Sequence, residues 1–183
     1  MPGYIIHLAV GKIYAQNNKI EDIESFEKGI MAPDMLEDKS KSHYGPYSSQ
    51  PGLNQFLREN GISTSYGEGY FLHLLTDYLF YHKFLTKWDK SIYSDYDKLN
   101  SILINKYKIT VPTQIQEKVK FEEGTPEIID EEKLEKFINT VGKINVRKII
   151  KEKQSRFEEQ INRNRFYKYR LTLKNSFHII YRY

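Results

Sequence analysis

Apolar side chains recur at helical spacing along most of this chain, and the pattern predicts a series of helices. In residues 4–14 the apolar positions 6, 10, 13 and 14 form a stripe, with His7 beside it, and Asn17 and Asn18 end the segment. The remaining helices are expected at residues 21–30, 52–59, 67–87, 96–107, 130–142 and 145–166. From these helices we expect an all-α fold in a single domain. Residues 170–183 alternate weakly and are compatible with an extended segment.

The helix expected at residues 67–87 has apolar and aromatic side chains on several faces and contains no proline. It is therefore predicted to be the most buried helix, around which the rest of the chain packs. The side chains expected in the core are those of Phe71, Leu74, Leu75, Tyr78 and Leu79.

The same helix carries His73 and Asp77 four positions apart. Because a helix turns about 100° per residue, the two side chains lie about 40° apart on one face. A buried imidazole and a buried carboxylate are costly unless something compensates them. A metal ion would do so, and so would a hydrogen bond within the pair; the spacing alone leaves both possibilities open.

Turn-forming residues interrupt the helical pattern at two further candidate ligands. Pro33 disfavours a helical conformation in the residue before it, so Asp34 is expected in a loop or tight turn. Residues 37–52 are rich in Ser, Gly and Pro and are expected to form a loop that carries His43. Residues 108–129 mix β-branched residues with Pro and Gly, which predicts an irregular crossing with room for one short helix.

The amino-acid composition limits which side chains could bind a metal ion. Of the 183 residues, 39% are hydrophobic and 28% are charged, which is typical of a globular protein, and none is cysteine. Thiolate metal sites and disulfides are therefore excluded. A set of His and carboxylate ligands suits Zn²⁺, with Mn²⁺ and Fe²⁺ as alternatives. The chain begins with neither a basic segment nor a long apolar run, so we expect a cytoplasmic enzyme or binding protein without a membrane span.

Charge is unevenly distributed along the chain. The net charge is +4, but residues 143–183 hold 12 basic and 3 acidic residues. Such a basic C-terminal segment can attract phosphates, nucleic acid or anionic lipid, although it is more often the solvated face of a lysine-rich protein. Its basic residues are spread along the segment, so any nucleic-acid binding is expected to be independent of sequence and sensitive to salt.

Most residues suited to metal binding fall in the first half of the chain, residues 1–90. Four of the five histidines are in this half, and the fifth, His178, stands alone. The candidate ligands are His7, Asp34, His43, His73, Asp77 and His82.

Three short motifs place these candidates in a recognisable order. They are Gly-Ile-Met-Ala-Pro33-Asp34, Lys-Ser-His43-Tyr and His73-x₃-Asp77-x₄-His82, preceded by His7. In this order the chain resembles the zinc-dependent phospholipase C and S1–P1 nuclease superfamily over residues 7–82. Beyond about residue 100 we find no resemblance.

The resemblance implies an all-helical protein with a zinc cluster at the bottom of a cleft. By matching position, Asp34, His43, His73 and Asp77 would form one metal site, Asp77 would reach towards a second ion shared with His7, and His82 would bind the remaining ion. A metal-bound hydroxide would attack a phosphoester in a small molecule, a lipid headgroup or a nucleic acid. His73 and Asp77 would be the residues on which catalysis depends.

Two features depart from the pattern of that superfamily. Its members usually complete the remaining metal site with a downstream His-x₃-Glu/Asp, whereas here the only later histidine is followed by Ile-Ile-Tyr-Arg. His82 also lies about 180° around the helix from His73, so it reaches the cluster only if the helix unwinds or bulges there.

The chain lacks the signature motifs of other hydrolase classes. There is no adjacent His-Asp pair of the HD phosphohydrolase type, no Gly-x-Ser-x-Gly elbow, and no phosphate-binding glycine loop. Two alternatives to a metal-dependent phosphoesterase stay open. One is a metal-binding protein with a structural or sensory role, and the other is a helical nucleic-acid-binding module that uses the basic C-terminal segment.

Overall fold

A computed structural model describes residues 3–153 of the chain, which divides into two compact units, residues 1–144 and 145–183. The described residues form helices joined by turns and contain no strand, so the expected all-α fold is confirmed. Among residues 3–153, no helix is both long and apolar enough to cross a membrane.

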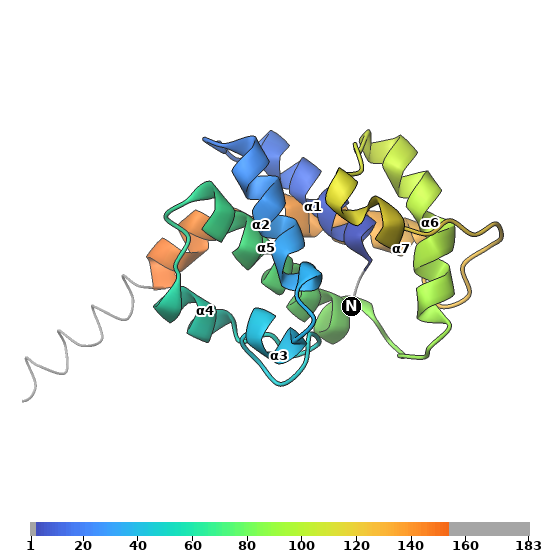
Figure 1. Cartoon of the computed structure of the whole chain (residues 1–183), viewed down its shortest axis with the longest axis horizontal. Coiled ribbons are helices and arrows are strands. Elements are labelled where there is room, and N and C mark those ends of the chain that lie inside the picture. The colour runs from blue at the N-terminus through green and yellow to red at the C-terminus, as the bar shows by residue number, and fades with distance from the viewer. Residues whose placement is uncertain (1–2, 154–183) are drawn as a thin grey trace, which may run out of the picture. The chain divides into compact units, whose positions relative to one another are not determined.

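The first unit is built from helices of very different lengths (Figure 1). Several begin at a polar residue whose side chain accepts a main-chain N–H of the first turn: Asp22 before α2, Thr64 before α5 and Asp130 before α7. The helices are α1 (Tyr4–Asn17), α2 (Ile23–Met35), α3 (Lys39–Ser42), α4 (Leu53–Glu59), α5 (Ser65–Leu79), a π-helix (Phe80–Phe84), α6 (Ile92–Tyr107), a 3₁₀-helix (Thr113–Lys118) and α7 (Glu131–Gly142).

Helices α2 and α5 cross with their backbones almost touching. A Cβ atom on Gly29 of α2 would lie 2.2 Å from the main-chain oxygen of Tyr66, and one on Gly69 of α5 would lie 2.1 Å from that of Phe26. Only glycine fits at either position. Helix α1 packs against both helices, so three elements that carry candidate ligands lie side by side (Figure 1).

The structure corrects the expected end of α2. The helix continues to Met35 with Pro33 inside its last turn, so Asp34 is helical and does not lie in a loop. Because Pro33 stands so near the C-terminal end, its missing N–H removes only one helical hydrogen bond. The buried residues of this turn pack against neighbouring helices, and tertiary packing outweighs the local preference.

The loop expected at residues 37–52 also contains more structure than its composition indicates. Asp38 accepts hydrogen bonds from the main-chain N–H groups of Ser40 and Lys41, and this cap starts the four-residue helix α3. His43 is the C-cap of α3, and its main-chain N–H donates to the oxygen of Lys39. A His in a polar segment is thereby held against the core.

The helix expected at residues 67–87 is shorter than predicted. It begins at Ser65, ends as an α-helix at Leu79 and continues as one turn of π-helix. Phe71 and Leu74 are in the core as expected, but Leu75 and Leu79 are half-buried and Tyr78 is exposed. Phe56 of α4 contacts Phe71.

Helix α6 holds the irregular segment that follows it. The helix starts at Ile92, four residues before its expected start, and the crossing contains one short helix as expected. The buried carboxylate of Asp95 accepts three main-chain N–H groups at 2.7–2.9 Å, those of Glu127, Ile128 and Ile129. Asn100 donates from its side-chain amide to the main-chain oxygen of Lys120 at 2.8 Å.

The basic C-terminal segment is described only at its beginning. Residues 146–153 are helical, and the side chain of Asn145 accepts a hydrogen bond from the main-chain N–H of Lys148. The remainder of the helix expected at residues 145–166 and the weakly alternating residues 170–183, including His178, lie outside the described residues.

Candidate metal centre

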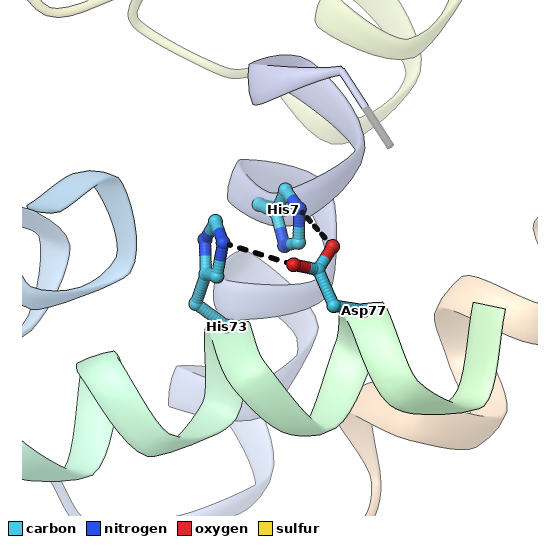
Figure 2. A group of neighbouring side chains, drawn as sticks. All are labelled: His7, His73 and Asp77. Carbon is cyan, nitrogen blue, oxygen red and sulfur yellow. Dashed lines mark ion pairs between the residues drawn. The ribbon is translucent and has the colours of Figure 1, made fainter. Parts of the chain in front are cut away.

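Five of the six predicted ligands meet at one place in the first unit. They come from four elements: His7 from α1, Asp34 from the last turn of α2, His43 from the end of α3, and His73 and Asp77 from α5. Each is at most 5% exposed. The one-turn spacing on α5 directs His73 and Asp77 to the same side, towards His7 on α1 (Figure 2).

His82 does not join this group. It lies in the π-helix, where it is exposed, and its ring rests against that of Tyr78 with centroids 4.6 Å apart. The helix does depart from α geometry there, as a ligand role would require. However, the departure starts only at Phe80 and does not turn His82 towards the buried cluster.

Asp34, His43 and His73 form one group that could hold a metal ion, and Asp77 lies close to both of its histidines. Nε2 of His43 lies 3.4 Å from Nε2 of His73 and 2.9 Å from Oδ2 of Asp77, and Nε2 of His73 lies 3.5 Å from that same oxygen. Oδ1 of Asp34 lies 3.6 and 3.7 Å from the two Nε2 atoms. Ligands at zinc's usual bond lengths on tetrahedral corners are about 3.3 Å apart.

The other oxygen of Asp77 belongs to a second possible site. Oδ1 lies 3.3 Å from Nε2 of His7, whose ring stacks on that of His73 with centroids 3.8 Å apart (Figure 2). His7, His73 and Asp77 together form a second group that could hold a metal ion. The two oxygens of one carboxylate therefore face two different ligand groups.

Polar contacts on the far side of two histidine rings fix how the rings are turned. Nδ1 of His73 lies 2.8 Å from the main-chain oxygen of Ile30, to which it can only donate, so Nε2 of the neutral ring is an acceptor, as a metal ligand must be. Nδ1 of His43 lies 2.9 Å from the hydroxyl of Ser42. The Nε2 atoms of the two rings lie 3.4 Å apart.

Several buried polar atoms of this cluster have no hydrogen-bond partner among the described residues. Burying such atoms without a partner is costly, and in native proteins an unexplained group of them often marks an ion or a water. They are Nδ1 and Nε2 of His7, Oδ1 of Asp34, and Oδ1 and Oδ2 of Asp77. The donor set therefore fits a metal ion.

The charges in the cluster are set by burial and by the mutual proximity of its members. Burial alone would raise the pKa of Asp77, but His73, His43 and His7 hold that pKa well below its usual range. Burial lowers the pKa of His7, and the neighbouring His73 lowers it further. For His73 the effect of burial is outweighed by Asp34 and Asp77, so its pKa is raised. Asp77 is thus an anion that faces His7 in its neutral form.

Two residues that sequence reasoning did not select complete the surroundings of Asp34. The ammonium of Lys39 lies 3.7 Å from Oδ1 of Asp34 and donates to its main-chain oxygen at 2.7 Å. The hydroxyl of Tyr4 donates to the same oxygen at 2.8 Å. The only hint in the sequence is that Lys39 precedes His43 by one helical turn.

A cleft of about 360 Å³ opens beside Asp34. It lies between the start of α1, the helix α6 and the segment that follows the 3₁₀-helix, and Asp34 is the one residue of the buried cluster that lines it. Its lining includes Tyr4, Asp34, Tyr93, Asn100, Lys118 and Lys120.

Comparison with known proteins adds no relative: no family model, curated protein or solved structure matches this chain. The resemblance to the phospholipase C and S1–P1 nuclease superfamily therefore stays a prediction that rests on the motifs of residues 7–82.

Proposed function

We propose that this protein is a metal-dependent hydrolase that acts on a phosphoester, with zinc as the metal. The observation that supports this most directly is the buried set of Asp34, His43, His73 and Asp77. The Nε2 atoms of the two histidines lie 3.4 Å apart, and each lies 2.9–3.7 Å from an oxygen of both carboxylates.

The division of ligands between the two groups favours catalysis over a purely structural role. The first group offers Asp34, His43 and His73, with Asp77 close to both histidines, and an ion held by all four residues would be saturated, as in structural sites. The second group is held by His7 and the free oxygen of Asp77, with His73 stacked alongside, and leaves positions open for water or substrate. A metal ion held there would supply an activated water and neutralise the charge of a phosphoryl group.

The residues of the chain contribute orientation and charge. The main-chain oxygen of Ile30 fixes the tautomer of His73, the hydroxyl of Ser42 holds the ring of His43 through Nδ1, and the anionic Asp77 links the two ligand groups. Lys39 supplies a positive charge beside Asp34. A metal-binding protein without catalysis is the second candidate, and the nearly complete burial of all five side chains favours it.

The proposal is tested by measuring metal content and hydrolysis of bis(4-nitrophenyl) phosphate on the same preparations. Asp77→Asn removes the carboxylate that both groups share, so we expect loss of bound zinc and a fall in kcat/KM of at least 100-fold. His7→Gln is expected to keep one ion and to lose the activity. The matched control is His82→Ala, which removes an exposed histidine of the same segment and should leave both quantities unchanged.

The outcomes separate the two candidates. Zinc content that is unaffected by Asp77→Asn would refute the metal centre. Stoichiometric zinc in the natural chain, with no hydrolysis of any phosphoester tested, would refute the hydrolase and support the structural role.

A further inference from the structure

The cleft beside Asp34 carries two lysines in different electrostatic settings. Lys120 lies near the carboxylate of Asp97, which lines the same cleft, so these two charges offset each other. Lys118 forms no ion pair within residues 3–153. Its ammonium lies 6.0 Å from the ring centroid of Tyr4, the residue whose hydroxyl donates to Asp34. Asp34 also lines the cleft, but its side chain is only 1% exposed and its carboxylate faces His43 and His73. The remaining charged residues of the lining, Asp97, Lys118 and Lys120, leave one excess positive charge.

The backbone around Lys118 is held in place. Lys118 is the last residue of the 3₁₀-helix, and the N–H of the next residue, Val119, donates to the oxygen of Ile115. Two residues after Lys118, the main-chain oxygen of Lys120 accepts a hydrogen bond from Asn100 of α6. The ammonium of Lys118 is thus carried by a segment whose backbone is hydrogen-bonded in place, as a selective subsite requires.

We propose that this cleft receives the organic part of the phosphoester, and that Lys118 selects substrates whose organic part carries its own negative charge, such as a carboxylate or a second phosphate. The inference rests on the proposed function, because it places the scissile phosphoryl group at the metal centre beside Asp34. It excludes a cationic headgroup such as choline as the preferred occupant, because the uncompensated charge of the cleft is positive.

The experiment measures binding and does not depend on turnover. Isothermal titration of the zinc-loaded full chain compares three ligands that differ in the charge of one end: 3-phosphonopropionate, its neutral isostere 3-methylbutylphosphonate, and phosphocholine. We expect the anionic ligand to bind about fivefold more tightly than the neutral one, as a partly exposed ion pair allows, and phosphocholine to bind most weakly. Added salt should reduce the preference.

Variants test whether the preference for the anionic ligand depends on the side chain of Lys118. Lys118→Ala should reduce the advantage of the anionic ligand to less than twofold, and Lys118→Arg should retain it. The matched control is Lys12→Ala, which removes a lysine from a separate groove of about 210 Å³ between α1 and α2 and should leave the order of ligands unchanged.

Failure of this inference is distinguishable from failure of the proposed function. Equal binding of the anionic and neutral ligands by the natural chain, or a preference that survives Lys118→Ala, would overturn the subsite whether or not the protein hydrolyses a phosphoester. A preference that depends on Lys118, in a protein without hydrolytic activity, would support the subsite and refute the hydrolase.

Discussion

His73 uses both nitrogens of its ring, and this double contact explains how one side chain can organise the centre. Nδ1 is held by the main-chain oxygen of Ile30 at 2.8 Å, so the ring cannot rotate without breaking a buried hydrogen bond. Nε2 is thereby aimed at His43, Asp34 and Asp77. Because the holding group belongs to the main chain, a substitution at position 30 does not remove it.

Five of the six candidate ligands named from the sequence meet in one cluster, but the surroundings of these residues could not be predicted. The i, i+4 spacing of His73 and Asp77 depends only on helix geometry. The burial of His43 depends on its position as the C-cap of a four-residue helix, and the contact of Lys39 with Asp34 depends on the fold. Neither arrangement leaves a periodic pattern in the sequence.

The two adjacent leucines of α5 allow a test of where the core lies. Leu74 is completely buried, whereas Leu75 is half-buried. Leu74→Ala should lower the free energy of unfolding by about 2–5 kcal/mol. Leu75→Ala should lower it by about 1 kcal/mol, because less apolar area is lost. Urea denaturation of both variants measures the difference, and equal losses would contradict the assigned core.

At the scale of elements, the crossing of α2 and α5 determines where the ligands meet. It brings the end of α2, with Asp34, to the face of α5 that carries His73 and Asp77. Hydrophobic periodicity predicted both helices but not their contact, because the glycines that permit it lack side chains and add nothing to an apolar stripe. The same packing explains why α2 continues through Pro33.

Gly29→Ala tests this crossing. A methyl group would lie 2.2 Å from the main-chain oxygen of Tyr66, so the helices must separate even though alanine is the better helix former. We expect the free energy of unfolding to fall by about 1–3 kcal/mol and zinc affinity to fall with it. Lys28→Ala changes the adjacent exposed residue, whose ion pair with Glu24 is on the surface, and should leave the free energy of unfolding nearly unchanged. Unchanged stability and zinc affinity in Gly29→Ala would show that the contact is looser than described.

At the scale of the whole molecule, the centre joins segments that are far apart in the sequence. His7 and Asp77, whose side chains lie 3.3 Å apart, are separated by more than a third of the chain. The order of the motifs indicated that these residues belong to one site. The arrangement of the helices around that site depends on tertiary packing, which no local segment encodes.

Removal of metal should therefore destabilise the entire first unit. An ion that binds only the folded chain, at a concentration 1,000 times its dissociation constant, adds about 4 kcal/mol to the free energy of unfolding. For a chain of this size that corresponds to a Tm higher by roughly 8–16 °C. Thermal scans with and without a chelator measure the difference, which should vanish in Asp77→Asn and persist in His82→Ala. Equal Tm values with and without chelator would show that no metal stabilises the fold.

The distance along the chain between His7 and Asp77 also has a consequence for the order of events during folding. The nascent or unfolded chain must close a loop of tens of residues before α1 and α5 supply ligands to the same ion, and such closures come late. A metal ion that joins after the rate-limiting barrier leaves the folding rate unchanged and slows unfolding instead. Metal would thus extend the lifetime of the native state without guiding the chain to it.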